Sequence, residues 1–167
     1  MLNSDSGVVN TALGAFGLPE INWLTSPTWS LIAVILANIW IGIPFNLVIL
    51  YSGLQNIPDN LFEAAALDGA SSWQTFRHVT LPLLRPVSAI TLLLGFVYTL
   101  KVFDIIWIMT RGGPGTSSTT MSTWSYQLGF GSLVPHFGPG AAVGNLLIIV
   151  ALLFGLLYIR FQWEAAQ

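Results

Sequence analysis

Hydrophobic positions form three long stretches along the chain, and polar segments separate them. Residues 31–51 carry no charge, residues 87–110 are uncharged up to Lys101, and residues 141–161 are uncharged up to Arg160. About 20 consecutive apolar residues are enough for a helix to cross the hydrocarbon core of a bilayer. The pattern therefore predicts an all-α membrane protein with three transmembrane helices in this chain.

A polar segment rich in small residues, 52–86, separates the first two stretches. Pro58 suits the first position of a short helix over residues 57–68, because a missing N–H costs nothing there. Gly69 is expected to end this helix in a left-handed conformation. Ser71 or Ser72 can cap a second short helix, which we expect to end at the prolines 82 and 86. We call this predicted helix–Gly–helix unit, residues 57–82, the elbow.

The composition supports a membrane protein and excludes several other classes. Of the 167 residues, 54% are hydrophobic and only 7% are charged, and the mean hydropathy is +0.73. A soluble domain carries roughly a quarter of charged residues, because its water-facing surface needs them. The net charge of −2 does not favour nucleic-acid binding. The absence of cysteine excludes disulfides and thiolate metal sites within the sequence.

The residues of the elbow resemble a known motif. Glu63-Ala64-Ala65, Asp68-Gly69-Ala70, Phe76 and Leu81-Pro82 stand at the spacing of the EAA loop of bacterial and archaeal ABC importer permeases. A lone EAA would be a weak signal, but the whole string is specific. The resemblance implies that these nine residues dock into a groove on a cytoplasmic ATPase subunit, with Glu63 reaching a basic residue there. Without the resemblance, the same pattern would describe an ordinary amphipathic surface elbow.

A second resemblance lies after the second apolar stretch. Thr110, Gly112-Gly113-Pro114 and Thr119-Thr120 are similar to the signature after the fifth span of carbohydrate permeases of the MalF/UgpA-like branch. The flanking Phe103-Asp104 and the segment 126–130 fit the same branch. The segment 7–24 resembles the external loop before the fourth span of such permeases. The resemblance therefore implies half of a type I importer transmembrane domain, and a chain that is the C-terminal part of a longer permease.

Polar and small residues inside the apolar stretches give two possible readings. Asn38, Gly42 and Phe45 share one helical face, and the next stretch carries a similar stripe at Gly95, Thr99 and Val102. Polar groups at membrane depth face protein or a water-filled path, because lipid cannot satisfy them. One reading is close helix packing through the glycine and hydrogen bonding by the amide. The other is that these six residues line a path for the substrate.

The remaining polar features carry less information. Lys101 and Asp104 are three residues apart, so on a helix they can pair; they suit either an interfacial ion pair or a ligand contact. The glycine-rich segment 110–115 lacks the lysine and the strand of a phosphate-binding loop, and it is interpreted as a turn. His136 has no second histidine or carboxylate nearby in the sequence, so a metal site is not expected. No catalytic motif is found, and we predict neither an enzyme nor a cofactor bound by this chain.

The basic residues set the expected orientation. With the elbow inside, Arg77, Arg85 and Arg160 lie on the cytoplasmic side and Arg111 lies outside, as the positive-inside rule favours. Trp23, Trp29 and Trp163 suit membrane interfaces. The predicted order is an external loop (1–30), a span (31–51), the cytoplasmic EAA loop (52–86), a span (87–110), an external loop (111–140), a span (141–161) and a cytoplasmic tail (162–167).

Taken together, the sequence predicts a permease subunit of an ABC importer for a sugar or a related solute in a bacterial or archaeal cytoplasmic membrane. The expected partners are a cytoplasmic ATPase that binds the ATP, a second permease subunit of MalG-like type, an extracytoplasmic solute-binding protein and membrane lipid. Two alternatives stay open: an importer of glycerol phosphate or an amino acid, and a non-transporting membrane scaffold protein. The sequence does not name the solute.

Overall fold

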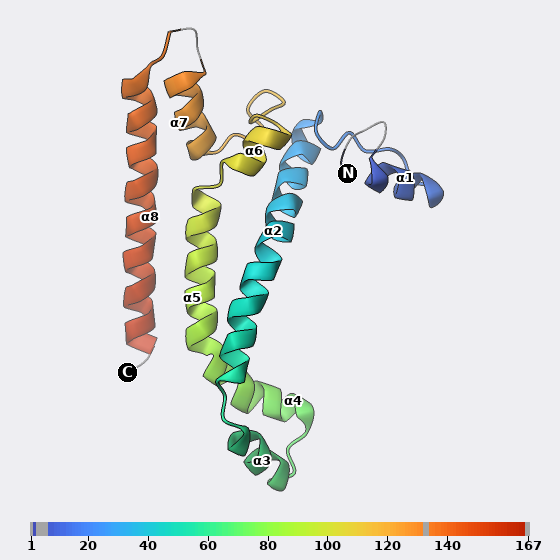
Figure 1. Cartoon of the computed structure of the whole chain (residues 1–167), viewed down its shortest axis with the longest axis vertical. Coiled ribbons are helices and arrows are strands. Elements are labelled where there is room, and N and C mark those ends of the chain that lie inside the picture. Colours follow the sequence, from blue (N-terminus) through green and yellow to red (C-terminus); the bar gives the residue numbers. More distant parts are fainter. Residues whose placement is uncertain (1, 3–6, 132–133, 166–167) are drawn as a thin grey trace. The chain divides into compact units, whose positions relative to one another are not determined.

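The computed structural model describes residue 2 and residues 7–131 and 134–165, and every regular element in that part of the chain is a helix (Figure 1). The elements in chain order are α1 (Val8–Ala15), α2 (Pro27–Gln55), α3 (Asp59–Leu67), α4 (Ser72–Thr75), a π-helix (Phe76–Thr80), α5 (Leu81–Leu100), α6 (Asp104–Met109), α7 (Met121–Phe130) and α8 (Phe137–Ala165). The all-α prediction is confirmed.

Three helical runs in the described residues are long and apolar enough to cross a membrane. They are Pro27–Gln55, Ser72–Leu100 and Phe137–Arg160. Each contains one of the three predicted apolar stretches or most of it. In the first run the helix continues through Pro44, so this proline does not divide the span. The predicted number of three candidate membrane-spanning helices is therefore confirmed.

The prediction that Pro82 and Pro86 end the second helix of the elbow was wrong. They do not end the second elbow helix, because the chain is helical without a break from Ser72 to Leu100. A π-helix directly precedes Pro82, and the N–H of Leu81 donates to the carbonyl of Phe76, five residues earlier. This wider turn reduces the clash between a proline ring and the carbonyl of the preceding turn. The first turn of the elbow's second helix is thus also the first turn of a membrane-spanning helix.

The second span also ends earlier than predicted, at Leu100 instead of residue 110. Residues 101–103 are not helical, and the short α6 follows. Lys101 and Asp104 consequently do not share a helical face. The Lys101 ammonium lies 4.6 Å from the centre of the Tyr98 ring, in a cation–π contact, and Asp104 opens α6. The predicted pairing of these two charges is therefore wrong.

The chain forms two compact units, which are described separately. The first contains Met1–Trp40 and Val97–Leu157, and the second contains Ile41–Phe96 and Tyr158–Gln167. In the second unit α2 and α5 approach closely at Gly53, where a Cβ would lie 2.9 Å from Val87 Cγ1 and 3.0 Å from Leu84 Cδ1. The Tyr158 hydroxyl donates to the Ala89 carbonyl and joins α8 to α5. Close helix approach at a glycine is typical of packing between membrane helices.

Hydroxyl groups organise the loop between α6 and α7 in the first unit. The Thr110 and Ser118 hydroxyls are 2.7 Å apart, and Thr119 Oγ1 donates to the carbonyl of Gly112 at 3.0 Å. The Ser117 and Ser30 hydroxyls, 3.0 Å apart, connect this loop to the start of α2. Gly112 and Gly115 have φ of +87° and +62°, which suits the turn predicted from the glycine-rich sequence.

The tryptophan nearest the N-terminus serves a packing role that the sequence did not indicate. Trp23 is only 7% exposed, and its indole N–H donates to the side-chain oxygen of Asn10 at 2.8 Å. Its ring contacts that of Trp29 edge to face, with the ring centres 5.2 Å apart. The contact ties the segment that contains α1 to the start of α2, and the interfacial position of Trp23 stays a prediction.

Candidate functional site

The elbow begins immediately after α2, in the second unit, and Figure 1 shows α3 and α4 as its two short helices. Ile57 is 7% exposed, which anchors the connection. Pro58, predicted as the first helical residue, has an extended backbone (ψ 134°) and is instead the N-cap residue of α3, one position before the observed first helical residue. Because a proline fixes φ near −65°, it still favours the start of the helix at Asp59.

The corner of the elbow is a Schellman motif centred on glycine. Gly69 has φ +72°, as the sequence predicted. Its N–H donates to the carbonyl of Ala66 at 3.1 Å, and the N–H of Ala70 donates to the carbonyl of Ala65 at 3.0 Å. These two bonds satisfy carbonyls at the end of α3 that have no partner within the helix. The corner angle therefore depends on a left-handed residue at position 69.

The second half of the elbow starts with a capping box. Ser71 Oγ accepts a hydrogen bond from the Gln74 N–H at 3.4 Å, and the Gln74 side chain accepts one from the Ser71 N–H at 2.8 Å. The sequence left Ser71 and Ser72 as alternative caps, and in the structure Ser71 is the N-cap residue of α4. The reciprocal bonds fix the direction of the chain immediately after the corner.

The elbow exposes apolar side chains although its sequence is largely polar. Leu67 is 90% exposed and Trp73 is 67% exposed. Trp73 stacks on Phe76, which is itself 43% exposed, with ring centres 5.6 Å apart. A hollow of about 370 Å³ between the two helices is lined by residues that include Asp68, Gln74 and His78. Exposed apolar groups around a hollow are typical of a surface that binds another protein.

The structure places the nine predicted docking residues on one continuous segment of the second unit. Glu63 and Ala64 are exposed and Ala65 is half-buried in α3, while Glu63 makes no ion pair with any described residue. Asp68 is the C-cap of α3 and does not cap the second helix. The others are Gly69 and Ala70 at the corner, Phe76 in the π-helix, and Leu81 and Pro82 in the first turn of α5. Their contact with an ATPase stays a prediction.

The six predicted path residues are distributed over both units. Asn38, Thr99 and Val102 belong to the first unit, and Gly42, Phe45 and Gly95 belong to the second. A Cβ at Gly42 would lie 3.7 Å from Asn46 Nδ2, and a Cβ at Gly95 would meet no described atom within 4 Å. Both glycines therefore leave room for a neighbour or a ligand. The role of these residues in a path stays a prediction.

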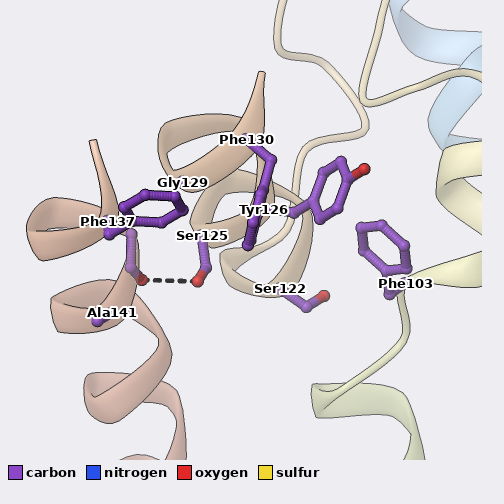
Figure 2. A pocket seen from close by; sticks show the side chains of 9 residues that line it. Phe103, Ser122, Ser125, Tyr126, Gly129, Phe130, Phe137 and Ala141 are labelled. Carbon is purple, nitrogen blue, oxygen red and sulfur yellow. Dashed lines mark hydrogen bonds between the residues drawn. The ribbon is translucent and has the colours of Figure 1, made fainter. Parts of the chain in front are cut away.

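The first unit contains a row of aromatic rings that the sequence did not indicate as a site (Figure 2). Neighbouring ring centres lie 5.0 Å apart for Phe103 and Tyr126, 5.4 Å for Tyr126 and Phe130, and 5.5 Å for Phe130 and Phe137. Trp107 also contacts Tyr126, at 4.8 Å. The i, i+4 spacing of the pairs 103/107 and 126/130 is a signal that indicates shared helical faces. Their meeting, however, requires the tertiary fold.

The aromatic row borders a cavity of about 430 Å³ in the first unit. Serines 122 and 125 also line it, and the Ser125 hydroxyl donates to the Gly140 carbonyl at 2.7 Å, which joins α7 to the start of α8 (Figure 2). The hydroxyls of Ser122 and Thr120 both donate to the carbonyl of Val102. These bonds fix α7 next to a residue of the predicted path.

Comparison with known proteins identifies the family. The model of the family "binding-protein-dependent transport system inner membrane component" matches residues 8–162. The chain belongs to this family. Membership places it in the inner membrane and agrees with the three apolar helices.

Two relatives and one solved structure illustrate the similarity. The chain is 38% identical over 163 residues to the trehalose/maltose transport system permease protein MalF of Thermococcus litoralis, covering 96% of this chain and 53% of that protein. It is 35% identical over 165 residues to the lactose transport system permease protein LacF of Rhizobium radiobacter, covering 96% and 54%. The crystal structure of a bacterial alginate ABC transporter in complex with an alginate pentasaccharide-bound periplasmic protein aligns with a TM-score of 0.87 at 30% identity, covering 99% and 57%. The chain thus spans little more than half the length of these relatives.

Proposed function

We propose that this chain belongs to a permease subunit of an ABC importer that moves a sugar across the cytoplasmic membrane. The observation that carries the proposal is the elbow, which exposes apolar side chains and continues without a break into the helix Ser72–Leu100. A displacement of the elbow by a partner would be passed directly to a membrane-spanning helix. Such a connection suits a transporter whose energy source lies in another subunit.

The relatives support a sugar as the transported solute. Their names describe transport of trehalose and maltose and of lactose, and the aligned structure contains an alginate pentasaccharide on its periplasmic protein. Alginate is acidic, but the two permeases named for neutral sugars share more sequence identity with this chain than the alginate transporter does, so we propose a neutral di- or oligosaccharide. Among the described residues the two spans predicted to form the path carry amide and hydroxyl groups at Asn38 and Thr99. These groups can exchange hydrogen bonds with sugar hydroxyls.

The proposed partners follow from what this chain lacks and what it exposes. The elbow would bind a cytoplasmic ATPase, and that partner would bind and hydrolyse the ATP. This chain itself would then be neither an enzyme nor an ATP-binding protein. A second, MalG-like permease subunit is proposed to complete the membrane path. The periplasmic protein in the aligned structure supports a solute-binding protein as the external partner.

The proposed mechanism is alternating access driven from the elbow. ATP binding by the ATPase would displace the elbow, and the continuous helix from Ser72 would transmit the movement to α5. Two features would keep the movement rigid: the Schellman corner at Gly69 and the capping box of Ser71 and Gln74. Helices that rock around a site near the midplane would then expose it to alternate sides.

The direct test uses the complete importer in proteoliposomes, with the full-length permease and the proposed partner permease, ATPase and solute-binding protein. We expect uptake of at least one of maltose, trehalose and lactose, and ATP hydrolysis that rises when that sugar and the binding protein are present. Purification of the permease without any ATPase, or absence of uptake for all three sugars, would contradict the proposal. The first outcome would favour a scaffold protein.

The orientation can be tested by thiol labelling, because the chain contains no native cysteine. Ser72 is exposed and suits a cysteine on the elbow; Ser117 is half-buried against Ser30, so the exposed neighbour Thr116 is the better external position. In intact cells we expect an impermeant maleimide to label Thr116→Cys but not Ser72→Cys. Both variants should react after permeabilisation, which controls for accessibility. The opposite pattern in intact cells would reverse the proposed topology.

A further inference from the structure

The aromatic cavity of the first unit is an open hollow with the volume of a ligand site. Its volume of about 430 Å³ lies within the range of roughly 300–1,000 Å³ that small-molecule pockets occupy. Its walls come from three segments that are separate in sequence: Phe103 before α6, one face of α7, and the first turns of α8 (Figure 2). The Ser125–Gly140 and Ser122–Val102 hydrogen bonds hold these segments together. The cavity is therefore a built feature of this unit.

The lining combines aromatic faces with hydroxyl groups. Phe103, Tyr126, Phe130 and Phe137 form a row in which each ring contacts the next. Ser122 and Ser125 each donate to a carbonyl, and each oxygen keeps lone pairs that can accept a hydrogen bond. The Tyr126 hydroxyl has no hydrogen-bond partner among the described residues, and the residue is 38% exposed. It is therefore free to bind a ligand hydroxyl.

We propose that this cavity is an outer sugar subsite, an inference that rests on the proposed function. The subsite holds a pyranose ring of the transported saccharide after the saccharide is released outside and before it enters the path in the membrane. A pyranose ring has an apolar face of C–H groups and a rim of hydroxyls. The aromatic row can cover the face, and the serine and tyrosine oxygens can bind the rim. The subsite begins directly beside Val102, which belongs to the predicted path.

The hydroxyl groups favour a sugar over a lipid chain as the occupant. A lipid acyl chain has no group that can bond to the Tyr126 hydroxyl, which would then lack a partner among the described residues, whereas Ser122 and Ser125 already bond to carbonyls. None of the described residues that line the cavity is charged, which fits a neutral sugar better than an anionic solute. The segments that form the cavity also flank the loop that the proposed topology places outside, where the solute arrives.

The first test measures occupancy at Tyr126 directly in the purified complete importer. Tetranitromethane nitrates exposed tyrosines, and peptide mass spectrometry reports each site. We expect the transported disaccharide among maltose, trehalose and lactose to reduce nitration of Tyr126 about fivefold, while Tyr51, which is 57% exposed and does not line the cavity, stays unchanged. Protection of Tyr126 by added phospholipid but not by the sugar would identify a lipid site and overturn the proposal.

The second test measures uptake by variants in proteoliposomes. We expect Tyr126→Ala and Phe130→Ala to raise the KM for the transported disaccharide about fivefold with little change in kcat, since each removes one aromatic contact. Tyr126→Phe keeps the ring and should have a smaller effect, and it replaces Tyr126→Ala if that variant does not assemble. Trp124→Ala is the matched control on α7, because Trp124 is half exposed and does not line the cavity.

The outcomes separate this inference from the proposed function. Uptake of a disaccharide with unchanged KM in both cavity variants, and without protection of Tyr126, would overturn the subsite and leave the importer proposal standing. Absence of uptake for all three sugars in the unmodified complex would overturn the sugar importer and with it the subsite. Protection together with the KM change, absent in Trp124→Ala, would support the subsite.

Discussion

Replacing Gly69 with valine is expected to uncouple ATP hydrolysis from sugar binding. Gly69 has φ +72°, a conformation that costs a residue with a Cβ roughly 1–2 kcal/mol, and most for a β-branched one. A cost of this size lowers the population of the native corner by about 5- to 30-fold. The Schellman hydrogen bonds of Gly69 and Ala70 would be lost, and Phe76 would be displaced. We therefore expect sugar-stimulated ATPase activity and uptake to fall about tenfold.

The chain offers a matched control at the same position. A Cβ at Gly69 would meet no described atom within 4 Å, so backbone conformation rather than space limits the substitution within this chain. Asparagine is close to valine in size but tolerates the left-handed conformation better. We expect Gly69→Asn to keep most of the stimulation. Equal losses in the two variants would show that bulk at the partner surface matters, and full activity in Gly69→Val would exclude the elbow as the coupling element.

Replacing Gly42 with tryptophan is expected to abolish uptake while the complex still assembles. Gly42 lies within α2 on the same helical face as Asn38 and Phe45. A Cβ there lies at ordinary contact distance, 3.7 Å from Asn46 Nδ2, so a side chain can leave the helix without a clash in the second unit. If this face lines the path, an indole would fill it, and we expect uptake to fall about tenfold or more. Binding of the sugar to the external protein and assembly with the ATPase should be unchanged.

The control for Gly42→Trp lies on the opposite face of the same helix. Leu47 is 60% exposed and points away from the predicted path face, on the side where the chain already carries Trp40, which is 77% exposed. We expect Leu47→Trp to transport at nearly the unmodified rate. Uptake at the unmodified rate in Gly42→Trp would contradict the path assignment and would leave helix packing as the role of Gly42. A loss of assembly in Gly42→Trp alone would also favour packing.

The continuous helix from Ser72 to Leu100 changes how coupling is understood. The sequence suggested an elbow that ends at two prolines, with a separate span after it. Instead, the π-helix Phe76–Thr80 directly precedes Pro82, and the chain remains helical through Pro82 and Pro86. Phe76, one of the predicted docking residues, thus lies on the same helical run as the predicted path residues Gly95 and Thr99. If the elbow binds an ATPase and these two residues line the path, as proposed, one continuous helix connects the two sites.

The sequence by itself determined the features that depend on local chemistry. The near-absence of charge over about 20 residues decides that a helix crosses the membrane, so the three spans and the all-α class followed directly. The left-handed corner at Gly69 was predictable because few other residues adopt φ +72° without strain. A serine cap of the second elbow helix was also predictable, but the choice of Ser71 over Ser72 and its capping box with Gln74 came from the structure.

Only the tertiary structure decided the features that depend on distant residues. No local rule indicates that a π-helix carries the chain through Pro82, or that the span ends at Leu100 and leaves Lys101 on the ring of Tyr98. The burial of Trp23 requires Asn10, thirteen residues earlier. The aromatic cavity exists because hydrogen bonds from α7 reach Val102 and Gly140, which are 20 and 15 residues away from their partners. Hydropathy and spacing describe what each segment prefers alone, whereas such sites arise where segments meet.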